Sequence, residues 1–261
     1  MQQRHLNRKL YFDEQEYTTK KYVIPYINCV STINSNMHVM EVGCGEGGNL
    51  KPFLDMGCKV TGIDISTYKI ELAKDFFSSH PHQKNLTLLN KNIYDTTVEE
   101  IGKFDVIFLR DTIEHIPNQI YFMNFIKDFL LPDGKLFLAF PIWRMPFGGH
   151  QQICKNKILS HLPYFHILPT PLYKNILKIF NESDDTISEL LSVKKTKISM
   201  SYFKKLLISS NLKIEKITYF LINPNYEIKF NLKPKELPFF LNIPYLRDFF
   251  ITNVYCVLSQ K

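Results

Sequence analysis

Short apolar runs alternate with amphipathic stretches through the middle of the chain. The run 104–109 is apolar at nearly every position, which is typical of a strand buried on both faces of a parallel sheet. In 67–77, by contrast, Ile70, Ala73 and Phe77 share one helical face, and Ser66 can cap that helix. Strands that alternate with helices predict βαβ units and a mostly parallel sheet. We expect strands at 39–42, 59–64, 86–89, 104–109 and 135–140, helices at 48–56, 67–77 and 119–130, and a turn at 132–134.

The alternation stops after Pro141. Residues 142–199 are rich in aromatics, prolines and histidines and carry no strand signal. We interpret them as a helical insertion that folds over the strand edge as a lid or substrate cap; a structural extension or a dimer arm is the alternative. Residues 1–36 predict one or two basic, tyrosine-rich helices ahead of the fold. Beyond the insertion we expect a helix at 201–209, strands at 213–221 and 252–258, and a long connection at 223–250.

The composition fits a single domain over all 261 residues. Apolar residues make up 45% and charged residues 22%, so a sizeable core can form. The net charge of +7 permits an acidic partner, but the lysines are scattered, which favours a mildly basic surface over a nucleic-acid or membrane site. Five cysteines without a Cys-x-x-Cys pair argue against a disulfide framework or a zinc knuckle. The first residues also lack a signal peptide, so we expect a cytoplasmic monomer or homodimer.

A glycine-rich turn follows the first expected strand. Gly43-x-Gly45-x-x-Gly48 lets the backbone bend sharply and approach a ligand, and Asp64 ends the second strand. A dinucleotide site has the same spacing, so a nicotinamide dehydrogenase competes as an interpretation. Glu41 separates the two, because a pyrophosphate would face like charge at the turn. S-adenosylmethionine (SAM) carries no phosphate and has a cationic sulfonium and ammonium, so it suits this acid better.

Four segments in order resemble the class I SAM-dependent methyltransferases. They are Glu-Val-Gly-Cys-Gly-Glu-Gly from Glu41, Val-Thr-Gly-Ile-Asp-Ile-Ser from Val60, Phe-Asp-Val-Ile from Phe104 and Leu-Pro-Asp-Gly-Lys-Leu from Leu131. The resemblance covers 38–141. It implies an α/β, Rossmann-like, mostly parallel sheet of seven strands with helices on both faces and an antiparallel last strand. It also implies cofactor binding by Glu41, Gly43, Cys44, Gly45, Asp64, Ile65, Asn92, Ile93 and Arg110, with Ile65 on the adenine and Asn92 where the family often has Asp.

A second polar cluster follows the fourth strand, in Arg110-Asp-Thr-Ile-Glu-His. If a helix begins there, Asp111, Glu114 and His115 stand at i, i+3 and i+4 and share one face. Two carboxylates and an imidazole can hold a divalent cation, and the oxygen-rich set favours Mg²⁺ or Mn²⁺ over zinc. Such an ion would lower the pKa of an acceptor hydroxyl. In the insertion, Gly148-Gly149 precedes His150, which can bend inward as a fourth ligand.

This arrangement resembles the acid-x-x-Glu-His signature of ubiquinone-pathway O-methyltransferases and of small-RNA 2′-O-methyltransferases. Asp111 stands where those families usually carry Glu, and the RNA enzymes add a downstream histidine, here His150. In the alternative interpretation no metal is bound, Glu114 and His115 pack beside SAM, and His150 is a general base. We therefore take Glu114, His115 and His150 as candidate catalytic residues, and Asp111 with these three as the candidate metal site.

The sequence thus predicts a methyltransferase of the type 11, ubiquinone-pathway kind, acting on a small molecule. Aromatic residues of the insertion, such as Trp143 and Tyr164, favour an oxygen of an aromatic or lipophilic acceptor, and Arg144 is available for an acidic group. An N-methyltransferase is the close alternative. An RNA 2′-O-methyltransferase is disfavoured because no RNA-binding accessory domain is visible. A catalytically silent SAM-binding subunit is the alternative from another functional class.

Overall fold

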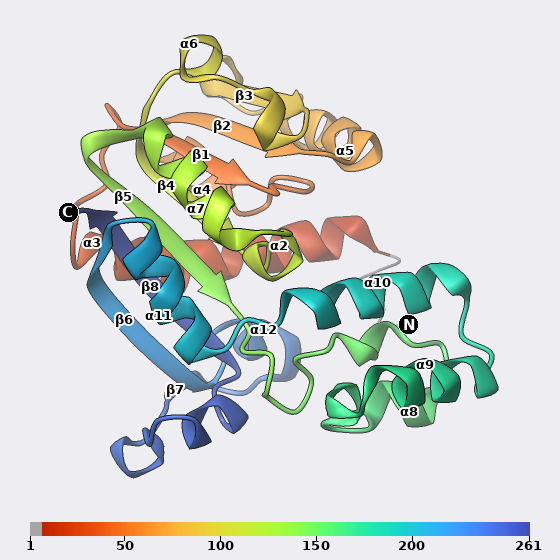
Figure 1. Ribbon diagram of the computed structural model, residues 1–261. Helices are drawn as coiled ribbons and strands as arrows, with labels where there is room; N and C mark the ends of the chain where they lie inside the picture. The colour runs from red at the N-terminus through yellow and green to blue at the C-terminus, as the bar shows by residue number, and fades with distance from the viewer. Residues whose placement is uncertain (1–6) are drawn as a thin grey trace.

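The computed structural model describes residues 7–261. Its centre is one mixed sheet with the strand order β3-β2-β1-β4-β5-β8-β6-β7 (Figure 1). The first five strands in this order are parallel, and β8 lies antiparallel to both β5 and β6. This confirms the predicted α/β fold and the antiparallel last strand, but the sheet has eight strands instead of the expected seven, because the two-residue strand β7 is added at one edge. The strands are β1 (His38–Val42), β2 (Lys59–Asp64), β3 (Leu86–Asn90), β4 (Phe104–Arg110), β5 (Leu130–Phe140), β6 (Leu212–Ile222), β7 (Lys235–Glu236) and β8 (Asn253–Gln260).

Helices cover both faces of the sheet, and two apolar clusters fill the space beneath them. The strands are buried because they carry apolar side chains on both faces; in β4 every residue except Asp105 is buried. Side chains from α7 (Gln119–Ile126) and α11 (Met200–Ser209) pack on one face, where Phe122 and Phe203 are fully buried. On the other face pack α2 (Arg8–Thr18), the π-helical segment η1 (Thr19–Val23), α3 (Ile24–Asn28), α4 (Lys51–Asp55) and α5 (Thr67–Phe77).

The sequence-based boundaries differ from the structure at three places. The helix expected at 48–56 begins only at Lys51, because Gly47 and Leu50 still form the turn. The helix expected at 119–130 is α7 (Gln119–Ile126) followed by a 3₁₀ turn. The turn expected at 132–134 was wrong: these residues lie inside β5 as a bulge, where β5 advances from Leu130 to Lys135 while β4 advances by two residues.

The predicted helical insertion between the fifth and sixth strands is confirmed. It contains α8 (Lys157–His161), α9 (Thr170–Ile179) and α10 (Asp184–Thr196), which lie together beside the sheet (Figure 1). These helices bury a small core of their own, including Tyr173 and Leu190. The remaining helices are α6 (Val98–Ile101), α11 (Met200–Ser209) and α12 (Asn225–Phe230), with 3₁₀ turns η2 (Gln83–Asn85), η3 (Ile93–Asp95), η4 (Ile113–His115), η5 (Lys127–Phe129), η6 (Gln151–Ile153), η7 (Phe165–Ile167), η8 (Phe239–Leu241) and η9 (Leu246–Phe249).

From residue 7 to the end of the chain, every helix is too short or too polar to cross a membrane.

Candidate functional site

The glycine turn connects β1 to α4 at the carboxyl edge of the parallel strands. Gly43 and Gly45 have positive φ angles of 76° and 54°, which favour glycine. At Gly43 a Cβ would also stand 2.6 Å from Cγ2 of Thr112. The backbone N–H groups of Gly43 and Cys44 both donate to the carbonyl of Ile63, at 2.8 and 3.1 Å. The turn is therefore fixed against β2, with its amides at the sheet edge where ligands of such folds bind.

Asp64 lies at the same edge and holds two loops together. Its Oδ2 accepts a hydrogen bond from the Gly45 backbone N–H at 2.9 Å, and its Oδ1 accepts one from Ser66 N–H at 2.8 Å. The residue is only 8% exposed. Because each carboxylate oxygen has a further lone pair, Asp64 can still accept from a ligand hydroxyl. Ile65, next to it, is 75% exposed and offers an apolar surface beside the carboxylate.

Glu41 lies under the glycine turn in a buried polar chain. Its Oε1 accepts from Asn49 Nδ2 at 2.6 Å, and Asn49 Oδ1 in turn accepts from the Arg110 guanidinium at 2.7 Å and from the Thr19 hydroxyl at 2.9 Å. Oε2 of Glu41 is buried and has no hydrogen-bond partner within residues 7–261. Burial raises the pKa of Glu41 well above its usual value, against the Asn49 hydrogen bond and the charge of Arg110. Arg110 is thus engaged with Asn49 and the N-terminal helices.

Three other predicted cofactor residues take different positions. Cys44 is buried, and its Sγ would stand 2.9 Å from a Cβ placed on Gly62, so its side chain points into the core. Asn92 is exposed, but its Oδ1 already accepts from Tyr94 N–H at 3.2 Å as the cap of η3. Ile93 is buried at the same edge. Cys44 can therefore offer a ligand its backbone only.

The N-terminal helix α2 closes over the glycine turn, which the sequence patterns did not reveal. Arg8 forms a salt bridge with the fully buried Glu46 of the turn, with Nε 2.6 Å from Oε1. A Cβ on Gly48 would stand 2.4 Å from the Phe12 carbonyl oxygen. Burial, with the charge of Asp111, raises the pKa of Tyr11 to about 12. The tyrosine-rich composition of 1–36 was the only sequence feature that pointed to this closure. The position of α2 on the turn could not be predicted, because it depends on contacts between residues far apart in the chain.

Glu114, His115 and His150 come together at the same edge. Each offers a ligand atom, and these atoms lie within 4.8 Å of one another. His150 Nε2 is 3.9 Å from Glu114 Oε1, and the two imidazole rings are 4.9 Å apart, edge to face. Both carboxylate oxygens of Glu114 are buried and lack a hydrogen-bond partner within residues 7–261. Burial and the charge of Asp111 raise the pKa of Glu114 well above its usual value, and burial lowers that of His150 to about 3.

The predicted helix face that joins Asp111 to this cluster was wrong. Residues Ile113–His115 form a 3₁₀ turn, and Asp111 precedes it with a positive φ of 52°. Asp111 therefore leaves the shared face, and its Oδ1 accepts from Asn253 Nδ2 of β8 at 3.4 Å. His150 does bend inward, as its two preceding glycines suggested: its φ is 58°, and a Cβ on Gly149 would stand 2.1 Å from Cβ of His166.

The donor set of the cluster fits a divalent transition metal. One carboxylate and two imidazoles are nitrogen-rich, whereas Mg²⁺ prefers oxygen ligands and usually keeps several waters. The unpartnered oxygens of Glu114 mark a site that is incomplete in polar contacts, as a buried carboxylate without hydrogen bonds is costly. Since Asp111 lies outside the set, the residues present fit zinc, iron or manganese better than Mg²⁺; of the two ions that the sequence favoured over zinc, only Mn²⁺ still fits well.

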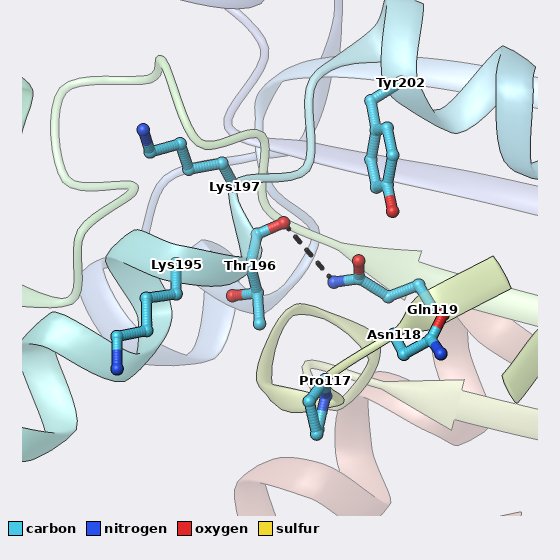
Figure 2. A pocket seen from close by; sticks show the side chains of 7 residues that line it. All are labelled: Pro117, Asn118, Gln119, Lys195, Thr196, Lys197 and Tyr202. Atoms are coloured by element: carbon cyan, nitrogen blue, oxygen red, sulfur yellow. Dashed lines mark hydrogen bonds between the residues drawn. The ribbon is translucent and has the colours of Figure 1, made fainter. Parts of the chain in front are cut away.

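A pocket of about 470 Å³ lies between the start of α7, the end of α10 and Tyr202 of α11 (Figure 2). Gln119 lines it and donates from Nε2 to the carbonyl oxygens of Thr196, at 3.5 Å, and of Ile113, at 3.3 Å. The Thr196 hydroxyl donates to the Glu114 carbonyl oxygen. These contacts fasten the turn that carries Glu114 to the insertion. The pocket is lined by Pro117, Asn118, Gln119, Lys195, Thr196, Lys197 and Tyr202.

Comparisons with known proteins agree with this fold. The profile of the Methyltransferase domain family matches residues 15–164, more than half of the chain. The chain therefore belongs to this family, within the class I SAM-dependent methyltransferases.

Among its relatives, the ubiquinone biosynthesis O-methyltransferase of Bartonella tribocorum is 31% identical over 147 residues, which are 55% of each protein. The corresponding protein of Haemophilus ducreyi is 34% identical over 110 residues, 39% of this chain and 44% of that protein. The chain spans about half of the length of these curated relatives.

Solved structures with the same fold are far more distant in sequence. A putative sarcosine dimethylglycine methyltransferase from Galdieria sulphuraria has a TM-score of 0.59 at 12% identity, covering 93% of this chain and 85% of that one. Geranyl diphosphate C-methyltransferase from Streptomyces coelicolor, bound to Mg²⁺, geranyl diphosphate and S-adenosyl-L-homocysteine, has a TM-score of 0.55 at 12% identity, with coverages of 90% and 78%. At such identities the likeness concerns the fold alone.

Proposed function

We propose that the protein is an enzyme that binds SAM over the glycine turn and transfers its methyl group to an oxygen of an aromatic or lipophilic small molecule. This proposal rests on two carboxyl groups that lie at the same sheet edge: Asp64, which accepts from the backbone of two loops, and Glu114, which is buried without a hydrogen-bond partner. Asp64 suits the ribose of a nucleoside cofactor, and Glu114 suits proton or metal chemistry at an acceptor. The names of the O-methyltransferase relatives support oxygen as the acceptor atom.

In the proposed cofactor site, Asp64 accepts from both ribose hydroxyls and the exposed Ile65 packs on the adenine. The Gly43 and Gly45 backbone approaches the methionine portion closely because no side chain intervenes. Oε2 of Glu41 is the free acceptor beneath the turn. Tyr11, on α2, covers the cofactor from above and keeps water away from the sulfonium.

The proposed chemistry is an in-line displacement, in which the acceptor oxygen bonds to the methyl carbon as the sulfonium sulfur leaves with the bonding pair. Positioning supplies most of the rate enhancement. Without a metal, the His150 imidazole accepts the hydroxyl proton, with Glu114 Oε1 3.9 Å from its Nε2. A divalent ion held by Glu114, His115 and His150 would, when bound, lower the pKa of the acceptor hydroxyl.

A two-stage experiment tests the function. Calorimetry with S-adenosylhomocysteine and with NAD⁺ establishes the cofactor class, and we expect binding of the first only. The purified protein is then incubated with SAM and matched acceptor panels of catechols, alkyl phenols and primary amines, while S-adenosylhomocysteine formation is followed. Turnover with phenolic hydroxyls supports the proposal. Turnover confined to amines would move the acceptor atom to nitrogen, and binding of NAD⁺ alone would overturn the assignment.

A further inference from the structure

The segment between β6 and β8 leaves and re-enters the sheet at the edge that carries the candidate site. β6 ends beside the start of β8, where Phe220 pairs with Asn253, and the next residue, Val254, pairs with Phe140 at the carboxyl end of β5. The carboxyl ends of the parallel strands lie at this same edge. In Figure 1 the dark blue chain that follows β7 extends beyond the ends of the long strands. This excursion is therefore positioned to touch whatever the site edge faces.

The outer part of the excursion exposes large apolar side chains. Phe239 is 90% exposed, Tyr245 68% and Phe240 62%, and the two phenylalanine rings lie 5.8 Å apart. Ile243 and Leu246 are exposed as well. Single exposed apolar residues are ordinary, but five within eight consecutive positions indicate a surface that is covered in use. We call these five residues the aromatic tip.

The aromatic tip is held on a firm base, so its exposure is not that of a loose loop. Arg247 is buried, donates to Asn242 Oδ1 at 2.9 Å and stacks over the Tyr219 ring at 4.9 Å. The neighbouring Asp248 is buried too and accepts from the Met200 backbone N–H at 3.2 Å. At the other end, β7 pairs with β6. The framework thus presents the apolar side chains outward.

Positive charge accompanies the aromatic tip. The exposed charged residues between β6 and β8 are Lys233, Lys235 and Glu236, so this surface carries two positive charges against one negative charge. Aromatic side chains flanked by lysines are the combination that binds the interface of an anionic bilayer. A symmetric pairing of two copies through the tip would instead bring these lysines toward their own counterparts, which is unfavourable.

An apolar groove lies between the insertion and the residue Phe249, which follows the tip in the chain. Its volume is about 540 Å³, and Tyr164, Ile167, Leu168 and Pro169 line it from the insertion. The Tyr164 hydroxyl donates to the Phe249 carbonyl oxygen at 3.3 Å. The excursion is therefore in contact with the insertion close to the tip. We propose that the aromatic tip inserts into the headgroup region of an anionic lipid bilayer, with Lys233 and Lys235 on the lipid phosphates.

Vesicle sedimentation tests this proposal without any methyl acceptor. The full chain is mixed with two kinds of vesicle, one of phosphatidylcholine alone and one in which about 30% of the lipid is phosphatidylglycerol. This proportion gives each lysine anionic lipid to contact. We expect binding to the anionic vesicles to be at least tenfold tighter, and to weaken as salt rises. F239S/F240S and K233E/K235E should each weaken anionic binding at least tenfold.

Matched changes elsewhere keep the test specific. Ile208 and Lys204 with Lys205 are exposed on α11. I208S and K204E/K205E should therefore bind vesicles like the natural protein, and circular dichroism should confirm that all variants fold. Equal binding to neutral and anionic vesicles, or loss of binding in the α11 variants alone, would overturn the proposal. So would a dimer in light scattering that F239S/F240S converts to a monomer while the protein ignores vesicles. The proposed methyl transfer is unaffected by any of these outcomes, because the cofactor and acceptor assays do not involve lipid.

Discussion

The two halves of the candidate site are built in different ways. The glycine turn and Asp64 come from two neighbouring strands, and their contacts, such as Gly45 N–H to Asp64 Oδ2, span only 19 residues. The Glu114–His115–His150 cluster instead joins a 3₁₀ turn to an insertion, and Thr196 holds the Glu114 carbonyl from 82 residues away. Contacts between neighbouring strands therefore fix the first half without help from the insertion. The second half depends on how the insertion docks, so its chemistry and its stability are coupled.

We expect the largest effect of a substitution in the Glu114–His115–His150 cluster. Glu114→Gln keeps the size of the side chain but replaces the one carboxyl group of the cluster, buried beside two imidazoles, with an amide that cannot ionise. We expect at least a 100-fold loss of methyl transfer, about 2.7 kcal/mol of barrier, together with loss of any bound metal. Turnover with catechol and metal content by mass spectrometry measure both. The exposed Glu71→Gln is the control, and full activity in EDTA would eliminate the metal while leaving His150 as base.

The second largest effect is expected where α2 contacts the glycine turn. Arg8→Ala leaves Glu46 buried without its partner. We expect the free energy of unfolding to fall by about 2 kcal/mol, less than for a fully buried pair because the Arg8 side chain is 20% exposed. Urea denaturation measures it. Lys9→Ala, which breaks an exposed pair with Asp13, should cost about 0.5 kcal/mol or less; equal losses in both variants would show that α2 is not fastened through Glu46.

Asp64→Ala tests the first half directly. We expect SAM to bind at least tenfold more weakly, about 1.4 kcal/mol, because two loops lose their common acceptor and the ribose loses its carboxylate. Calorimetry gives the dissociation constant, with the exposed Asp133→Ala as the control. Unchanged affinity would remove Asp64 from the cofactor site.

The smallest effect concerns the base of β1, which carries the glycine turn. His38 packs on Phe104, and burial lowers its pKa to about 4, with the charge of Lys59 acting in the same direction. The unfolded chain takes up this proton near pH 6.5 and the folded chain only near pH 4, so stability is lost as pH falls through that window. We expect His38→Asn to reduce this loss by about 1 to 3 kcal/mol. Urea titrations at pH 7 and 4.5 measure this loss of unfolding free energy. His82→Asn, at an exposed position, should leave the difference between the two pH values unchanged.

The same contrast explains what could be foreseen from the sequence. The positions of β4 and α5 could be predicted from local periodicity. The glycine turn could be predicted because its backbone angles favour glycine at those positions. The inward bend of His150 was also foreseeable, because two glycines precede it. The position of Asp111 was not, because a 3₁₀ turn and an α-helical turn read alike over five residues. The closure of α2 over Gly48 was equally hidden, since it depends on a contact across 36 residues between Phe12 and Gly48.

The close fit of α2 over the glycine turn has a consequence for turnover. The Phe12 carbonyl lies against Gly48 and Arg8 binds Glu46, so α2 must move before a nucleoside can pass between it and the glycine turn. Exchange of S-adenosylhomocysteine for SAM would then require a hinge motion of α2. The detachment of this helix, rather than the chemical step, would limit turnover at saturating substrate.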